Sequence, residues 1–156
     1  MNHDTFMSEA LKEARRAYEK NEVPIGAIIV FEEKIIARAH NLREALQTTA
    51  SHAEMLAIAD ANAKTGFWRL DGSTLYTTVE PCMMCAGAIV QARISRVVYG
   101  TKDLKAGCGG TFFNILQDDR FNHQCEVIGG VLEEECRAIL SRFFKELRKK
   151  RSENFS

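Results

Sequence analysis

The sequence lacks the features that direct a chain into or across a membrane. It begins without a charged-then-apolar leader, and its longest apolar runs are too short to span a bilayer. It also lacks linkers, internal repeats and low-complexity segments. Its 156 residues are 46% hydrophobic, which is enough for one core. We therefore predict a single domain spanning residues 1–156, in the cytoplasm and without a membrane partner.

A net charge is also absent, since 21 basic residues balance 21 acidic ones. Overall electrostatics therefore do not indicate a polyanionic partner. Basic residues nevertheless gather near the end, where five of the seven residues 145–151 are Lys or Arg. Such a group can bind nucleic acid. Alternatively, its positive charges interact favourably with a helix C-terminus and are solvated by water. The group alone favours neither interpretation.

The five cysteines, without a leader, indicate a reducing compartment and metal binding rather than disulfides. Cys82 and Cys85 form a Pro-Cys-x-x-Cys motif, and His52 precedes them in a His-x-Glu motif. These motifs offer three zinc ligands, whereas structural zinc sites are normally closed by four. The open fourth position is typical of catalytic zinc. The sequence thus predicts a catalytic zinc site held by His52, Cys82 and Cys85.

Glu54 allows two interpretations. If Ser51 is a helix N-cap, Ser-x-x-Glu forms a capping box in which the glutamate binds the backbone of the cap residue. Because Glu54 is two residues from a predicted zinc ligand, its carboxylate can instead lie beside the open position of the metal. There it can take a proton from water, deliver it to a ring nitrogen, and later protonate departing ammonia. We favour this catalytic role.

Hydrophobic periodicity predicts alternating helices and strands. An amphipathic helix runs over 6–18, and a hairpin with strands 24–31 and 34–40 turns at Glu32-Glu33. A helix capped by Ser51 follows, and a second helix over 82–92 begins next to Pro81. The remaining predicted elements are strands at 73–78, 96–100 and 125–128 and a closing basic helix over 132–150. We predict an α/β fold, a three-layer α/β/α domain with a mixed five-stranded sheet and the metal site at helix N-termini.

The motifs resemble those of the bacterial tRNA-specific adenosine deaminases, part of the cytidine/deoxycytidylate deaminase superfamily. His52-Ala53-Glu54 and Pro81-Cys82-Met83-Met84-Cys85 match motifs shared among zinc-dependent nucleobase deaminases. Motifs between residues 96 and 144 resemble the tRNA branch specifically. These are Arg96-Val97-Val98-Tyr99-Gly100, Asp103-Leu104-Lys105, Phe121-Asn122-His123, Gly130-Val131-Leu132 and Phe143-Phe144. The resemblance covers nearly the whole chain and implies a cytidine-deaminase-like domain.

The resemblance implies hydrolytic deamination of the wobble adenosine in a tRNA anticodon to inosine, with release of ammonia. It implies one Zn²⁺ per subunit, a homodimer, and an anticodon stem-loop as partner. Glu54 matches the catalytic proton shuttle, and His52, Cys82 and Cys85 match the metal ligands. The implied substrate contacts are Ile25 and Ala27 at the base pocket, Asn41 at the nucleoside, Asp103, Lys105 and Asn122 at flanking nucleotides, and Phe144 in a helix that closes over the RNA.

Two alternatives remain open from the sequence. A deaminase of a free purine or pyrimidine, of guanine or cytosine type, would use the same zinc motifs with a closed pocket. Taken together with Asp103, Lys105 and Asn122, the basic residues near the end argue for RNA instead. A non-catalytic zinc-stabilised module would need a fourth ligand, which Cys108 or His123 could supply.

Overall fold

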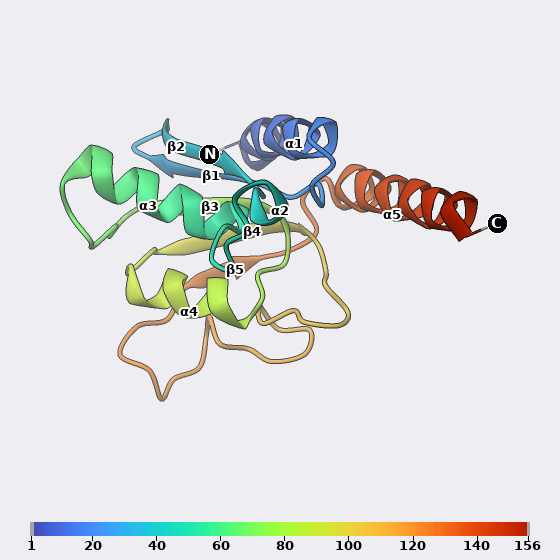
Figure 1. Cartoon of the computed structure of the whole chain (residues 1–156). Helices are drawn as coiled ribbons and strands as arrows, with labels where there is room; N and C mark the ends of the chain where they lie inside the picture. Colours follow the sequence, from blue (N-terminus) through green and yellow to red (C-terminus); the bar gives the residue numbers. More distant parts are fainter. Residues whose placement is uncertain (1, 156) are drawn as a thin grey trace.

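The computed structural model describes residues 2–155, in which helices cover both faces of a five-stranded sheet (Figure 1). The sheet has the order β2-β1-β3-β4-β5. Its strands are β1 (Gly26–Phe31), β2 (Lys34–His40), β3 (Thr74–Val79), β4 (Arg96–Thr101) and β5 (Glu126–Ile128). The helices are α1 (His3–Glu19), α2 (Arg43–Leu46), α3 (Ala53–Thr65), α4 (Met83–Gln91) and α5 (Glu133–Phe155). The predicted α/β fold and five strands are confirmed.

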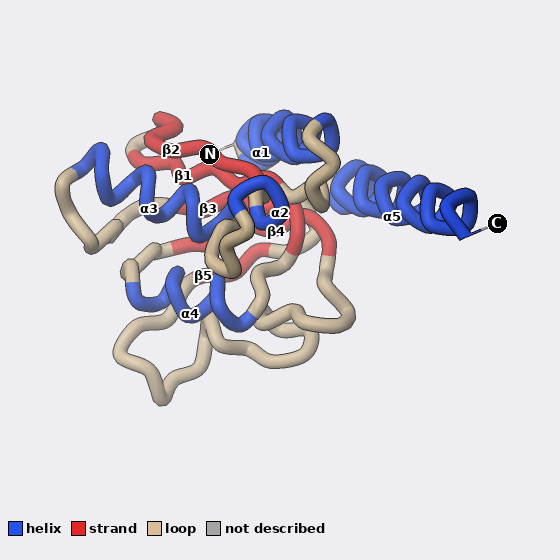
Figure 2. The backbone as a smooth tube through the Cα atoms, viewed as in Figure 1, coloured by secondary structure: helices blue, strands red, loops and turns tan. Residues whose placement is uncertain are grey.

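The sheet is mixed, as predicted. β1 pairs antiparallel with both β2 and β3, whereas β3, β4 and β5 are parallel. The β1–β2 turn falls at Glu32 and Glu33, which both adopt positive φ, as a two-residue hairpin of this twist requires. α4 connects the parallel strands β3 and β4, and a long loop over residues 102–125 connects β4 to β5 (Figure 2, tan). The predicted strand–helix–strand crossover is therefore β3–α4–β4.

Alternating side chains of the strands face two separate hydrophobic layers. On one face, Ala27 and Ile29 pack in the core under α3 and α4; on the other, Ile28 and Val30 pack against α1 and α5. Figure 1 shows these two helical layers and the last turns of α5 extending past the sheet. Among residues 2–155, none of the helices combines the length and apolarity needed to cross a bilayer.

Several predicted boundaries were wrong by one to five residues, and two shifts concern the site. α3 has His52, not Ser51, at its N-cap. Ser51 is buried and its carbonyl accepts the Leu42 N–H at 3.0 Å, so it belongs to the preceding loop. Glu54 then occupies the second helical position, which does not fit the capping box. Likewise Cys82, not Pro81, precedes the first turn of α4, because the Pro81 carbonyl is bound by a distant loop.

Two glycines provide a matched test of the packing between layers. A Cβ on Gly26 would lie 2.1 Å from the Ala10 carbonyl oxygen and 2.5 Å from the Ala14 nitrogen in α1, whereas a Cβ on Gly87 in α4 would meet nothing within 4 Å. We expect Gly26→Ala to lower the free energy of unfolding by roughly 2 kcal/mol or more through overpacking. We expect Gly87→Ala to raise it by about 0.5–1 kcal/mol through helix propensity. Urea denaturation measures both, and equal effects would contradict the packing described.

Candidate active site

The three predicted metal ligands converge, although His52 and Cys82 are separated by a helix and a strand. His52 Nδ1 lies 3.6 Å from Cys82 Sγ and 3.5 Å from Cys85 Sγ. A tetrahedral zinc ion, with bonds of about 2.3 Å to sulfur and about 2.0–2.1 Å to nitrogen, places such atoms about 3.6 Å apart. All three ligand atoms lie within 4.8 Å of one another. This metal-ligand cluster therefore suits zinc in both donor type and spacing.

Two of the ligands occupy equivalent positions at the starts of neighbouring helices. His52 is the N-cap of α3 and Cys82 the N-cap of α4, both with extended backbone, and neither side chain makes a cap hydrogen bond. Those side chains thus point away from their own helices and toward each other. Cys85 lies one turn into α4. The partial positive charge of both helix N-termini favours thiolate at this point.

The two cysteines share a hydrogen bond that makes their sulfurs unequal. The pKa of Cys82 is lowered to about 5 because the Cys85 thiol donates to it. The pKa of Cys85 is raised for the same reason, and burial adds to the rise. Two thiolates and one neutral imidazole would balance the two charges of a zinc ion, which leaves the metal electrophilic.

Glu54 lies beside the cluster in the first turn of α3 and is 4% exposed. Burial raises the pKa of Glu54 to about 7, and negative charge on Cys82 adds to the rise. Among residues 2–155, the group of side chains placed to hold a metal contains His52, Cys82 and Cys85 but not Glu54. The carboxylate is therefore next to the cluster without belonging to it.

Comparisons with known proteins agree with this geometry. A family model described as MafB19-like deaminase matches residues 1–148. A tRNA-specific adenosine deaminase of Bacillus subtilis (strain 168) is 60% identical over 148 residues, covering 95% of this chain and 92% of that protein. The chain belongs to this deaminase family. Its members include a tRNA-specific adenosine deaminase of Aquifex aeolicus (strain VF5), which is 46% identical over 95% of this chain and 97% of that protein.

A solved member of the family also matches in three dimensions. A structure from a study of A-to-I editing by tRNA:A34 deaminases at the wobble position of transfer RNA is 42% identical, with a TM-score of 0.84 over 87% of this chain and 99% of that chain. The fold is therefore the cytidine-deaminase-like α/β fold expected for the family, and the chain is an enzyme of the deaminase class.

The predicted base-pocket residues lie on the same face of the sheet as α3 and α4. Ile25 packs partly buried against that core, and Ala27 is fully buried within it. Asn41 is 5% exposed, and its backbone N–H donates to the Ile25 carbonyl at 3.0 Å. The Asn41 side chain binds the Val23 carbonyl and the Arg43 N–H. Their substrate roles stay predictions.

The structure brings only some of the predicted RNA contacts toward this site. Asp103 and exposed Lys105 lie in the loop that leaves the carboxyl end of β4, where α4 begins. Phe144 lines a groove of about 460 Å³ with Lys102 and Arg148. Asn122, however, is next to His123, whose Nε2 lies 2.7 Å from the Ile94 carbonyl oxygen before the start of β4. Asn122 is thus at the opposite end of the sheet from the cluster.

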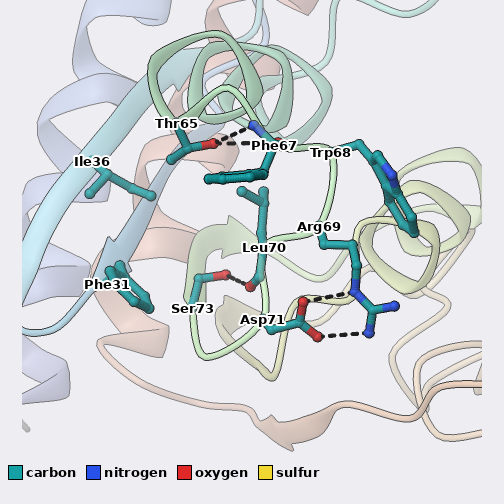
Figure 3. A pocket seen from close by; sticks show the side chains of 9 residues that line it. All are labelled: Phe31, Ile36, Thr65, Phe67, Trp68, Arg69, Leu70, Asp71 and Ser73. Carbon is teal, nitrogen blue, oxygen red and sulfur yellow. Dashed lines mark hydrogen bonds and ion pairs between the residues drawn. The ribbon is translucent and has the colours of Figure 1, made fainter.

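Two hollows lie at opposite ends of α3. One, of about 410 Å³, is lined by His52 and by α2 and the turn after it, so it opens beside the metal-ligand cluster. The other, of about 550 Å³, lies beyond the end of α3 and contains none of the predicted site residues (Figure 3). Its lining is largely apolar, with an exposed ion pair between Arg69 and Asp71. Of these two hollows, only the one beside His52 is lined by a residue of the metal-ligand cluster.

Sequence patterns missed two buried carboxylates and the short helix α2. Glu22 is 1% exposed and accepts the N–H groups of Glu44 and Ala45, so it holds α2 at the edge of the hollow beside His52. Glu80 is 2% exposed and binds the loop after β4. The only sequence signal is an acidic residue at the edge of an apolar segment, which is too common to predict either contact.

Proposed function

We propose that this chain deaminates the wobble adenosine of a tRNA anticodon to inosine, releasing ammonia. The observation that carries the proposal is a three-ligand metal cluster with a buried glutamate beside it, in a chain 60% identical to a tRNA-specific adenosine deaminase. The fourth metal position then serves the reaction. Cys108 and His123 lie outside the cluster, which argues against a closed structural zinc site.

His52, Cys82 and Cys85 hold one zinc ion per subunit in this proposal. The ion supplies a Lewis acid that activates water at neutral pH. Glu54 is the catalytic acid/base: it accepts one proton from the attacking water and passes it to the adenine ring nitrogen, then accepts the remaining proton of the new hydroxyl and passes it to the leaving amine. The new C–O bond thus replaces the C–N bond, and ammonia departs. Burial of Glu54 keeps bulk water from competing for these proton transfers.

In this proposal, side chains near the metal-ligand cluster bind the RNA. Ile25 and Ala27 shape the base pocket and Asn41 binds the nucleoside, while Asp103 and Lys105 contact nucleotides beside the target. The groove at Phe144 combines an aromatic ring 40% exposed with basic side chains, which suits an unstacked base and its phosphate.

We also propose that two copies of this chain form a homodimer, which acts in the cytoplasm. Met83 at the start of α4 is 74% exposed, and Phe112 and Phe113 are 63% and 62% exposed. The Phe112 and Phe113 rings adjoin, with centroids 4.8 Å apart, and adjoining exposed apolar groups are typical of contact surfaces. Asn122 lies away from the cluster of its own subunit, so its contact with RNA would be made at the site of the partner.

Inosine formation tests the proposal directly. Zinc-loaded protein is mixed with an anticodon stem-loop carrying adenosine at the wobble position, and the digested RNA is analysed by mass spectrometry. The matched control stem-loop carries its adenosine one position away, and free adenosine, guanine and cytosine are tested in parallel. We expect inosine only from the wobble adenosine. Ammonia released only from a free base or nucleoside would keep the zinc chemistry and contradict the RNA substrate.

A further inference from the structure

Glu80 is a buried carboxylate with no role in the chemistry described above. It lies between the end of β3 and Pro81, and it is 2% exposed. Its two oxygens accept four hydrogen bonds from the loop that follows β4. The donors are the backbone N–H groups of Asp103, Gly109 and Thr111 and the Thr111 hydroxyl. Hydrogen bonds to an ionised acceptor are about twice as strong as neutral ones, so this carboxylate is a strong anchor.

The hydrogen bonds to Glu80 explain why glycine occupies two positions in this loop. A Cβ on Gly107 would lie 2.4 Å from Glu80 Oε1, and one on Gly109 would lie 3.3 Å from Glu80 Cγ. A Cβ on Gly107 would also lie 2.6 Å from the Asp103 carbonyl oxygen, so this position cannot carry a side chain unless the backbone shifts, whereas Gly109 is only tightly packed. In residues 107–110, which include three glycines, the backbone therefore packs closely against the Glu80 side chain.

The anchored loop joins the predicted RNA contacts to the metal-ligand cluster. Its first residues include Asp103, whose Oδ1 accepts the N–H groups of Lys105 and Ala106 and so shapes the turn. Further along, the Cys108 N–H donates to the Pro81 carbonyl at 2.8 Å, one residue before the ligand Cys82. The position of Asp103 and Lys105 relative to the cluster therefore depends on how the loop is held.

We infer that Glu80 is a positioning residue, which holds residues 103–111 in the conformation that binds nucleotides beside the target adenosine. The inference rests on the proposed function. We expect these contacts to flanking nucleotides to be equally strong in the bound substrate and in the transition state, and the loss of such uniform binding raises KM and leaves kcat unchanged. Loss of a merely structural contact would instead lower stability without this split.

Thr111 gives the cleanest test, because it contacts Glu80 from the loop side and leaves the residues around Cys82 unaltered. Thr111→Val removes one donor with little change of shape, and Thr111→Ser keeps the hydroxyl. We expect Thr111→Val to raise KM for the stem-loop about tenfold, as loss of a charged hydrogen bond implies, and Thr111→Ser to restore the wild-type value. kcat and zinc content should stay at wild-type levels in both variants.

Glu80→Gln is compared with Glu13→Gln, a control at another carboxylate 2% exposed, paired with Arg38 on the opposite face of the sheet. We expect Glu80→Gln to raise KM at least as much as Thr111→Val does. Glu13→Gln should lower the melting temperature and leave KM unchanged. If Glu80→Gln does not fold, the two Thr111 variants decide alone. Amide hydrogen exchange in residues 103–111 should speed up in Thr111→Val and stay at the wild-type rate in Thr111→Ser.

An unchanged KM in Thr111→Val, with a wild-type protein that edits the stem-loop, overturns the inference and leaves the proposed function standing. A fall in kcat with zinc loss and unchanged KM in Glu80→Gln also overturns it, because Glu80 would then act on the metal site. A wild-type protein that leaves the stem-loop unedited contradicts the proposed function instead. In that case amide hydrogen exchange still tests whether Glu80 holds the loop. If exchange in residues 103–111 is unchanged in Thr111→Val, the inference is overturned.

Discussion

Glu54→Ala should lower the rate of stem-loop deamination by about 10²–10⁴-fold, the usual loss when a general acid/base is removed. Glu54→Gln should have a similar effect, because the amide keeps the shape of the side chain and cannot carry the proton. The zinc content of both variants should equal that of the wild type, since Glu54 lies outside the metal-ligand cluster. Single-turnover kinetics and metal analysis by mass spectrometry measure the two quantities separately.

Asp60→Asn is the matched control for this experiment. Asp60 lies on the same helix, α3, about two turns beyond Glu54, and forms an exposed ion pair with Lys64. Its substitution should leave the rate near the wild-type value, because exposed pairs contribute little. A wild-type rate in Glu54→Ala would contradict the catalytic role. Zinc loss in that variant would make Glu54 a metal ligand.

The metal-ligand cluster could be predicted because part of its signal is local. Cys82 and Cys85 are three residues apart on one helix, and this spacing limits where their side chains can meet a metal. Residue types and spacing also indicated that a histidine from another helix would complete the set, and the 3.5 and 3.6 Å separations confirm the convergence of the three side chains.

The starts of the two site helices could not be predicted to the residue. Each was shifted by a contact between a carbonyl and a chain segment distant in sequence: Leu42 for Ser51, and Cys108 for Pro81. Local preferences favoured Ser51 as an N-cap and Pro81 as the first helical residue, and tertiary hydrogen bonds outweighed those preferences. The consequence is functional, because the shift makes His52 and Cys82 the N-cap residues and leaves their side chains free for a metal.

The segments around the site could not be predicted from the sequence for a related reason. Glu22 and Glu80 bind backbone groups more than twenty residues away, and such contacts leave no periodic pattern. The four-residue helix α2 is likewise too short for a hydrophobic period to reveal it. Metal-binding residues at a fixed sequence spacing could therefore be predicted here. The loops around the site could not, because their conformation depends on contacts that form only in the folded chain.

Cys82→Ser and Cys85→Ser should each weaken zinc binding by about 10²-fold, and deamination should fall with zinc content. The binding free energy of a zinc site, shared among its ligands, is about 3 kcal/mol per ligand, which corresponds to about 10²-fold in affinity. A serine hydroxyl is a poor replacement for a thiolate, because it stays protonated at neutral pH. Zinc content after dialysis against a weak chelator, measured together with the deamination rate, gives the result for each variant.

Cys108→Ser separates this catalytic site from a closed structural one. Cys108 is buried, and its sulfur lies 3.5 Å from the Ala106 carbonyl oxygen, outside the metal-ligand cluster. Its substitution should therefore leave zinc affinity at the wild-type level while Cys82→Ser and Cys85→Ser lose the metal. Equal zinc loss in all three variants would mean that Cys108 closes the coordination sphere. A position filled by sulfur could not receive water or substrate, so that result would contradict hydrolysis at this metal.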